Sequence, residues 1–222
     1  MGKLFASIAL CAAAILAPAH ADTVTLTWVD SGAYTDFGRH QPDNTNYIAG
    51  NCMDCNMGLP GIDFRNFFVF DTRALTGQVT SGILRLRNGY VAAAGVYSVF
   101  DVGTAVDVLR AAHSDAVDIY DDLGSGLQYG SAAVRTTDET GRTLVDVVLN
   151  ADAIAAINAS NGLFALGGRY SGALQAFGGT NTDERRQLIL QMSAAVPEPG
   201  SVALLGAGVA MLALSRRRPR RA

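Results

Sequence analysis

Short runs of alternating hydrophobic and polar residues recur along most of the chain. Residues 23–29 read Thr-Val-Thr-Leu-Thr-Trp-Val, and residues 143–149 read Thr-Leu-Val-Asp-Val-Val-Leu. A period of two places neighbouring side chains on opposite faces of a strand, so each run predicts a half-buried β-strand. Glycine, asparagine and aspartate residues typical of turns separate the runs. Further strands are predicted at residues 65–70, 82–87, 96–102, 164–170 and 187–192.

The spacing of these strands predicts the fold class. Residues 65–70 form the most apolar run and are expected at the centre of a sheet, whereas residues 31–63 are turn-rich, with order expected mainly at 47–49. A helix is predicted at residues 150–160, where Asn150 is a suitable N-cap, and a helical turn at 106–112. Seven or eight short strands with one or two short helices favour a mainly β fold, an antiparallel β-sandwich of jelly-roll type.

An apolar stretch at the start of the chain departs from this pattern. Residues 1–21 contain Lys3, an apolar run, and the small residues Ala19 and Ala21 at the positions of a cleavage site. These features predict a secretory signal peptide, with Asp22 as the first residue after cleavage. Signal peptidase and the Sec translocon are therefore expected partners.

Three features follow one another near the other end of the chain. Pro197, Glu198 and Pro199 precede an apolar run at residues 202–214, and an arginine cluster follows it: Arg216, Arg217, Arg218, Arg220 and Arg221. A helix over these thirteen apolar residues spans about 20 Å, against a hydrocarbon core of about 30 Å. We expect a transmembrane helix held only transiently, with the arginines acting as a cytoplasmic stop signal. An ordinary single-span anchor is the alternative.

The order of these features resembles the PEP-CTERM sorting signal of Gram-negative bacteria that make extracellular polysaccharide. The resemblance implies that an exosortase, a cysteine-type enzyme of the inner membrane, recognises Pro197, Glu198 and Pro199. It also implies export through the inner membrane to the cell surface or extracellular matrix. The predicted organisation is a signal peptide at residues 1–21, a β-sandwich domain at 22–195 and a sorting segment at 196–222.

The charge of the predicted domain argues against a nucleic-acid partner. Residues 22–195 contain eleven arginines and no lysine, against seventeen aspartates and two glutamates, which gives a net charge of −8. Nucleic-acid binding needs cationic groups that neutralise phosphates. Aspartate oxygens could bind Ca²⁺, although their spacing does not match an EF-hand loop. We therefore expect no metal site and no cofactor, with calcium as the alternative.

Two cysteines, Cys52 and Cys55, remain if Cys11 leaves with the signal peptide. In an oxidising compartment a Cys-x-x-Cys pair in a glycine- and asparagine-rich loop favours a small structural disulfide. A redox site, free thiols or a metal site are the alternatives. A redox thiolate is typically found at the start of a helix, which this sequence does not predict.

The predicted domain offers few residues for catalysis, so we expect a non-enzymatic protein. His113, Ser114 and Asp115 have the residue types of a hydrolytic triad, but triad members converge from separate segments. The remaining histidine, His40, has no metal-ligand spacing. Paired carboxylates could serve a glycosidase, yet a solvated face explains them more simply: Asp115, Asp118, Asp121 and Asp122. Aromatic residues could stack on sugars, although most are expected in the core: Trp28, Tyr34, Tyr47, Tyr90 and Tyr129.

A second, weaker resemblance concerns residues 68–86. A strand ending in Phe-Asp, a loop, and a strand ending in Leu-Arg-Leu resemble a segment of DNRLRE-type β-sandwich modules, which are linked with polysaccharide binding and bacterial surface structures. Three functions follow from the sequence. The first is a surface or matrix protein associated with exopolysaccharide and biofilm, the second a carbohydrate-binding module, and the third a secreted hydrolase that uses aspartates.

Overall fold

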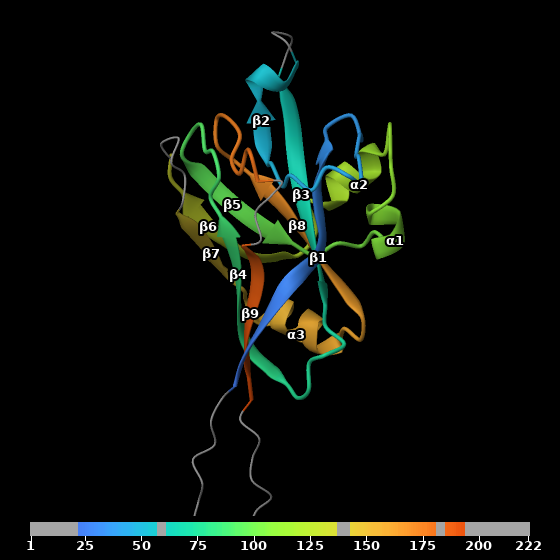
Figure 1. Cartoon of the computed structure of the whole chain (residues 1–222), viewed down its shortest axis with the longest axis vertical. Helices are drawn as coiled ribbons and strands as arrows, with labels where there is room; N and C mark the ends of the chain where they lie inside the picture. The colour runs from blue at the N-terminus through green and yellow to red at the C-terminus, as the bar shows by residue number, and fades with distance from the viewer. Residues whose placement is uncertain (1–21, 57–60, 137–142, 181–184, 194–222) are drawn as a thin grey trace, which may run out of the picture. The chain divides into compact units, whose positions relative to one another are not determined.

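The computed structural model describes residues 22–56, 61–136, 143–180 and 185–193 (Figure 1). Asp22–Ser193 forms one compact unit. Its strands are β1 (Thr23–Thr35), β2 (Gly50–Cys52), β3 (Ile62–Asp71), β4 (Val79–Arg87), β5 (Gly95–Phe100), β6 (Gln128–Val134), β7 (Leu144–Val148), β8 (Leu163–Tyr170) and β9 (Arg186–Met192). Its helices are the 3₁₀ helix η1 (Met53–Asn56) and the α-helices α1 (Val106–Leu109), α2 (Val117–Asp122) and α3 (Ala151–Ala159).

The strands pair antiparallel in the order β6-β5-β8-β3-β1-β9-β4-β7, and β2 pairs with β3. The sheet has two halves, β6-β5-β8-β3 and β9-β4-β7, and the long strand β1 joins them by pairing with both. Residues 23–27 pair with β9, whereas residues 28–35 pair with β3. The register shifts between Trp28 and Asp30, so β1 passes from one half to the other at a bulge.

The main core gathers side chains from both halves of the sheet. Phe68 and Phe70 of β3 pack in the same cluster as Leu84 of β4 and Leu188 of β9. Helix α3 adds its buried face to this cluster through Ala153 and Ile157, so it covers one end of the core. Burial of this large apolar surface is the main force that stabilises the fold.

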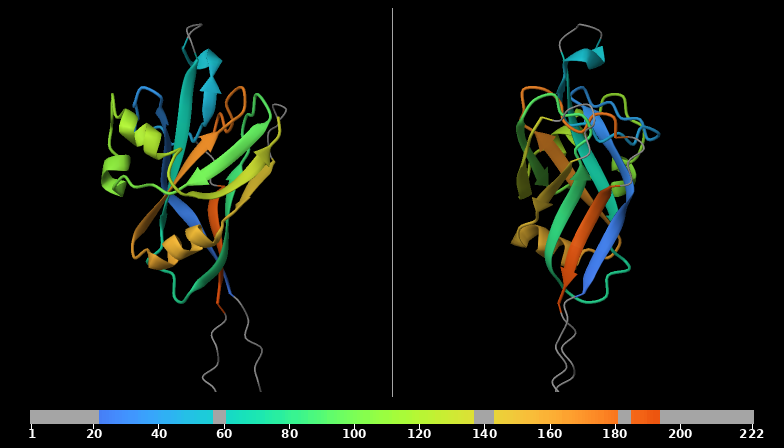
Figure 2. Two further views of the ribbon diagram at one scale, coloured as in Figure 1. Left: turned by 180° about the vertical axis from the view of Figure 1, so that it is seen from behind. Right: turned by 60° about the vertical axis from the view of Figure 1, so that its left-hand side comes forward.

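A second core lies on the opposite face of β3, which explains why this strand is apolar on both sides. Phe67 and Val69 pack with Tyr34 of β1. The segment with α1 and α2 covers them with Leu109, Ile119, Tyr120 and Leu123, and both helices lie beside β1 and β3 (Figure 2).

A small polar network stands inside the main core. Asn66 is fully buried; its side-chain nitrogen donates to the carbonyl of Tyr47 over 2.7 Å, and its oxygen accepts from the Tyr97 hydroxyl over 2.7 Å. Because both ends of the amide have partners, the network avoids the cost of buried unpaired polar groups.

The predicted fold class is confirmed as mainly β, with an antiparallel sheet and few helices. Strand β3 is central, and Asn150 caps α3 by accepting a hydrogen bond from the Ala153 amide over 3.0 Å. The expectation of one or two helices is wrong, since three short α-helices are present in the described segments. Strand β6 was not predicted because Gln-Tyr-Gly-Ser-Ala-Ala-Val is small and weakly alternating.

The prediction that residues 31–35 belong to a turn-rich segment is also wrong. These residues continue β1, but small and polar side chains are buried on both faces of the sheet there, so no alternation marks the strand. Among the described residues, none of the helices has the length and apolar character needed to cross a membrane.

The two ends of the domain lie together. Thr23 at the start of β1 pairs with Gln191 near the end of β9, and the carbonyl of Asp22 accepts a hydrogen bond from the Met192 amide over 2.8 Å. Strand β2 and η1 lie at the opposite end of this domain (Figure 1).

Candidate functional site

The sorting and processing residues predicted from the sequence lie outside the described residues. This holds for the predicted signal cleavage site, for the Pro-Glu-Pro motif and for the arginine cluster: Ala19, Ala21, Pro197, Glu198, Pro199, Arg216, Arg217, Arg218, Arg220 and Arg221. Their roles, and the boundaries at residues 21 and 195, stay predictions.

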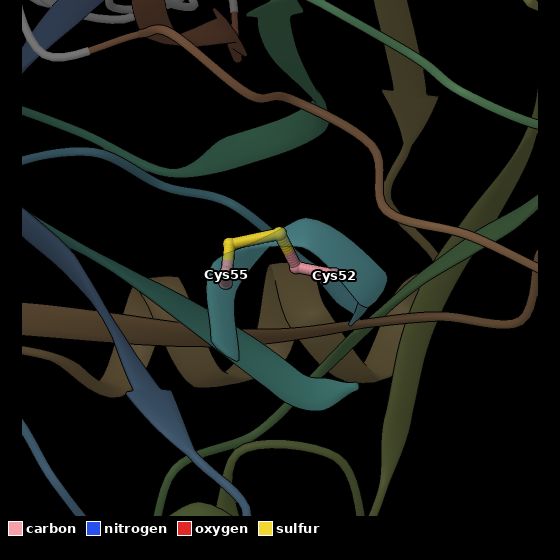
Figure 3. The surroundings of a disulfide bond; sticks show 2 residues. All are labelled: Cys52 and Cys55. Carbon is pink, nitrogen blue, oxygen red and sulfur yellow. A yellow bond between two sulfur atoms is a disulfide. The ribbon is translucent and has the colours of Figure 1, made fainter. Parts of the chain in front are cut away.

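A disulfide joins Cys52 and Cys55 (Figure 3), with 5.4 Å between their Cα atoms. Cys52 ends β2 and is buried, whereas Cys55 is exposed in the single turn of η1. The bond therefore closes the turn that follows β2. Cys55 also lines a shallow pocket of about 260 Å³ beside Phe37 and Arg39.

The two histidines of the domain lie side by side, which the sequence analysis did not predict. His40 and His113 form an isolated antiparallel bridge, and the Tyr34 ring stacks on His40 with 4.7 Å between centroids. Nδ1 of His40 lies 3.1 Å from the carbonyl of Ala33. Burial lowers the pKa of His40, so the neutral ring is favoured.

The residues His113, Ser114 and Asp115 do not assemble a triad. Nε2 of His113 lies 2.8 Å from the carbonyl of Val108, and the Ser114 hydroxyl donates to Asp115 over 3.2 Å. Both interactions are local, so they hold the loop after α1 in place.

The neighbouring aspartates also serve local structure. Asp121 pairs with Arg65 over 3.4 Å, and Asp122 accepts hydrogen bonds from the backbone amides of Gly103 and Thr104. Within the described segments, no group of three or more His, Cys, Asp or Glu side chains is arranged to hold a metal ion.

The five aromatic residues considered for sugar stacking divide into two groups. Tyr34 and Tyr47 are fully buried and Tyr129 is 6% exposed, so these three are core residues. Tyr90 is 48% exposed beside Gly178. Trp28 is partly buried and lines a pocket.

The Trp28 pocket is an open hollow of about 460 Å³ between β1, the loop after it and the α1 segment. Three consecutive residues of β1 line it, namely Trp28, Val29 and Asp30. The other lining residues are Pro42, Thr45, Asp107, Arg110 and Ala111.

Two polar side chains of this pocket are held in place by an ion pair. Nε of Arg110 donates to one oxygen of Asp30, and the other oxygen of Asp30 accepts from the Ser31 amide over 2.8 Å. Asp107, in the first turn of α1, is exposed and adds a second carboxylate.

The described residues thus form an antiparallel β domain with an aromatic, mildly acidic surface pocket. Residues 195–221 match the PEP-CTERM protein-sorting motif. The chain therefore carries a PEP-CTERM sorting signal, which implies an exported protein targeted by an exosortase to the cell surface of a Gram-negative bacterium. No curated protein matches the chain. The resemblance of residues 68–86 to DNRLRE-type modules gains no support from these comparisons.

Proposed function

We propose that this protein is a non-enzymatic component of the bacterial surface or extracellular matrix, associated with exopolysaccharide and biofilm. The observation that carries the proposal is the PEP-CTERM match at residues 195–221. This motif begins two residues after Ser193, the last residue of the compact unit, so the sorting signal follows the β domain directly. On this view signal peptidase acts first, and exosortase then cuts near Pro197 and Pro199.

Deletion of residues 196–222 tests the sorting step. We expect the truncated protein to stay in the periplasm, whereas the full chain reaches the surface or the medium. The intact mass of the protein recovered from surface and medium reports both processing sites at once. Normal surface delivery of the truncated chain would contradict the proposal.

A variant with a single change separates recognition from folding. Glu198→Ala should slow exosortase processing, and the matched change Glu184→Ala, at the glutamate that precedes Glu198 in the sequence, should leave processing unchanged. Equal processing of the two variants would argue that the Pro-Glu-Pro motif is not what the enzyme reads.

Carbohydrate binding is the second candidate function. One half of the sheet has the order β1-β9-β4-β7 and the other has the order β3-β8-β5-β6. If β2 is left out and the other eight strands are numbered from one to eight along the chain, these orders become 1-8-3-6 and 2-7-4-5. This order supports the predicted jelly-roll sandwich, an architecture that also serves lectin domains. A glycan array with the exported protein tests this function, and lack of binding to any glycan, with and without Ca²⁺, would count against it.

A further inference from the structure

We infer that the Trp28 pocket is a binding site for an uncharged sugar ring of a polysaccharide and discriminates against uronate sugars. This inference rests on the proposed association with exopolysaccharide and gives that association a site and a ligand class.

The first argument is the bulge in β1. In a regular strand, consecutive side chains point to opposite faces of the sheet, so Val29 would point away from the side that Trp28 and Asp30 face. The register shift between Trp28 and Asp30 relaxes this rule, and Trp28, Val29 and Asp30 all line the pocket. Bulges commonly redirect side chains at functional sites. Trp28 and Asp30, two positions apart, share a face even in a regular strand, so what the bulge adds to the lining is the intervening residue Val29.

The second argument is that the indole ring is held in place. The guanidinium group of Arg186 lies over the Trp28 ring, 4.0 Å from its centroid. Arg186 is itself fully buried; it donates to the Ser31 hydroxyl and to the Thr180 carbonyl. A ring supported on one face by a buried cation loses little freedom when a ligand packs against its remaining surface.

The third argument concerns hydrogen bonding. Nε of Arg110 is used in the bond to Asp30, and the other four N–H donors of a guanidinium group lie on its two terminal nitrogens. The carboxylate of Asp107 provides acceptors in the same hollow. Donors and acceptors beside an aromatic surface suit a pyranose, which has an apolar face of C–H groups and a rim of hydroxyls.

The charge of the pocket selects among sugars. Two aspartates and one arginine line it, so its net charge is −1, and residues 22–195 carry a net charge of −8. Asp30 already balances the charge of Arg110, so a uronate carboxylate would meet net repulsion from Asp107. An uncharged sugar meets no such penalty.

The protein contains a single tryptophan, so fluorescence reports on Trp28 directly. The exported protein, purified from the cells that secrete it, is titrated with dextran, hydroxyethyl cellulose, mannan and the uronate polymer alginate. We expect saturable binding to at least one neutral polymer, with alginate at least about tenfold weaker. Failure to bind all three neutral polymers, or a preference for alginate, would overturn the inference.

Charge reversal gives the sharper test. Asp107→Arg changes the net charge of the pocket from −1 to +1 and should strengthen alginate binding by about tenfold or more. Asp152→Arg is the matched control, because Asp152 is an exposed aspartate in the first turn of α3 and lies outside the pocket. If both variants change alginate binding equally, the effect belongs to the whole surface and the inference fails.

A stacking variant completes the design. Trp28→Ala should weaken binding to the neutral polymer by about tenfold. Calorimetry measures this binding, because the variant lacks the fluorophore. Trp28 also packs against the core, so Arg110→Gln provides a second variant if the first does not fold. A protein that is sorted correctly but binds no neutral polymer would overturn this inference and leave the proposed sorting intact.

Discussion

The guanidinium group of Arg186 lies 4.0 Å from the centroid of the Trp28 ring, and both residues sit where β1 changes from one half of the sheet to the other. Arg186 is fully buried and donates to Ser31 and Thr180. Arg186→Met should lower the free energy of unfolding by about 3 kcal/mol, since it removes a desolvated cation–π contact and charged hydrogen bonds. Urea unfolding followed by Trp28 fluorescence measures the change.

The control for this prediction is Arg169→Met on β8. Arg169 is exposed, and exposed positions usually tolerate substitution within about 0.5 kcal/mol. A similar loss of unfolding free energy in the two variants would mean that the buried contacts of Arg186 stabilise the domain no more than an exposed arginine does.

The hydroxyl of Tyr97 is predicted to stabilise the core through Asn66. Tyr97→Phe leaves the side-chain oxygen of Asn66 without the bond it accepts over 2.7 Å, in a site with no exposure for either residue. We expect a loss of about 1–3 kcal/mol. Tyr90→Phe, at a half-exposed tyrosine, should change stability little, and an equally small effect at Tyr97 would contradict the role of the network.

Gly38 is predicted to be required for the packing of the α2 segment. Its φ is +79°, and a Cβ atom placed there would lie 2.2 Å from the backbone nitrogen of Ala116. Gly38→Ala should therefore cost more than the roughly 1–2 kcal/mol typical of a left-handed non-glycine residue. Gly179→Ala isolates that smaller cost, because φ is +69° and nothing lies within 4 Å. Equal midpoints of thermal unfolding would show that the contact with Ala116 is easily relieved.

The stability of the domain is predicted to fall as the pH drops below about 6.5. Burial, the largest influence, lowers the pKa of His40; the Ala33 carbonyl and Asp30 act in the opposite direction, and His113 adds to the lowering. The unfolded state then binds more protons than the folded state. The contribution of His40 to stability is therefore fully present above its pKa in the unfolded state, and it is lost as the pH falls toward its pKa in the folded state.

Urea midpoints measured between about pH 5.5 and 7.5 check this dependence. His40→Gln, which keeps a donor toward the Ala33 carbonyl but does not titrate, should flatten the profile. An unchanged slope in this variant would assign the dependence to other groups.

The disulfide between Cys52 and Cys55 is predicted to contribute modestly to stability. It closes a loop with a sequence separation of 3, and a loop this short gives on the order of 2 kcal/mol in the chain-entropy model. Reduction of the native chain, or the double change Cys52→Ala and Cys55→Ala, should produce that loss in urea unfolding. The double variant should no longer respond to reductant, and a much larger loss would indicate that the bond positions more than its own turn.

Local patterns in the sequence were sufficient to predict the class of fold. The apolar run of β3 and the cap at Asn150 are local signals, and both predictions agree with the structure. Burial of β1 beyond Asp30 depends on α1 and α2, which pack on it from more than 70 positions away along the chain, as the bond from Tyr34 to the carbonyl of Leu109 illustrates. No short stretch of the sequence therefore shows that β1 is buried beyond Asp30.

Some of the candidate functional residues could likewise be found from the sequence, whereas others are brought together only by the fold. The sorting motif is linear, so its residues could be read directly from the sequence, and the family comparison supports it. The Trp28 pocket joins β1 to α1 across the bond between Asp30 and Arg110, which are 80 positions apart. Trp28 was already a candidate for sugar contact, but its polar neighbours could not be named without the fold.

The pairing of Thr23 with Gln191 has a mechanical consequence. Because β1 begins where β9 ends, a force applied between the two ends of the domain would separate the strands one hydrogen-bonded pair at a time, as in a zipper. The ladder would resist such a pull far less than a pull that shears all pairs together. A domain held at one of these ends alone is not pulled in this weak direction.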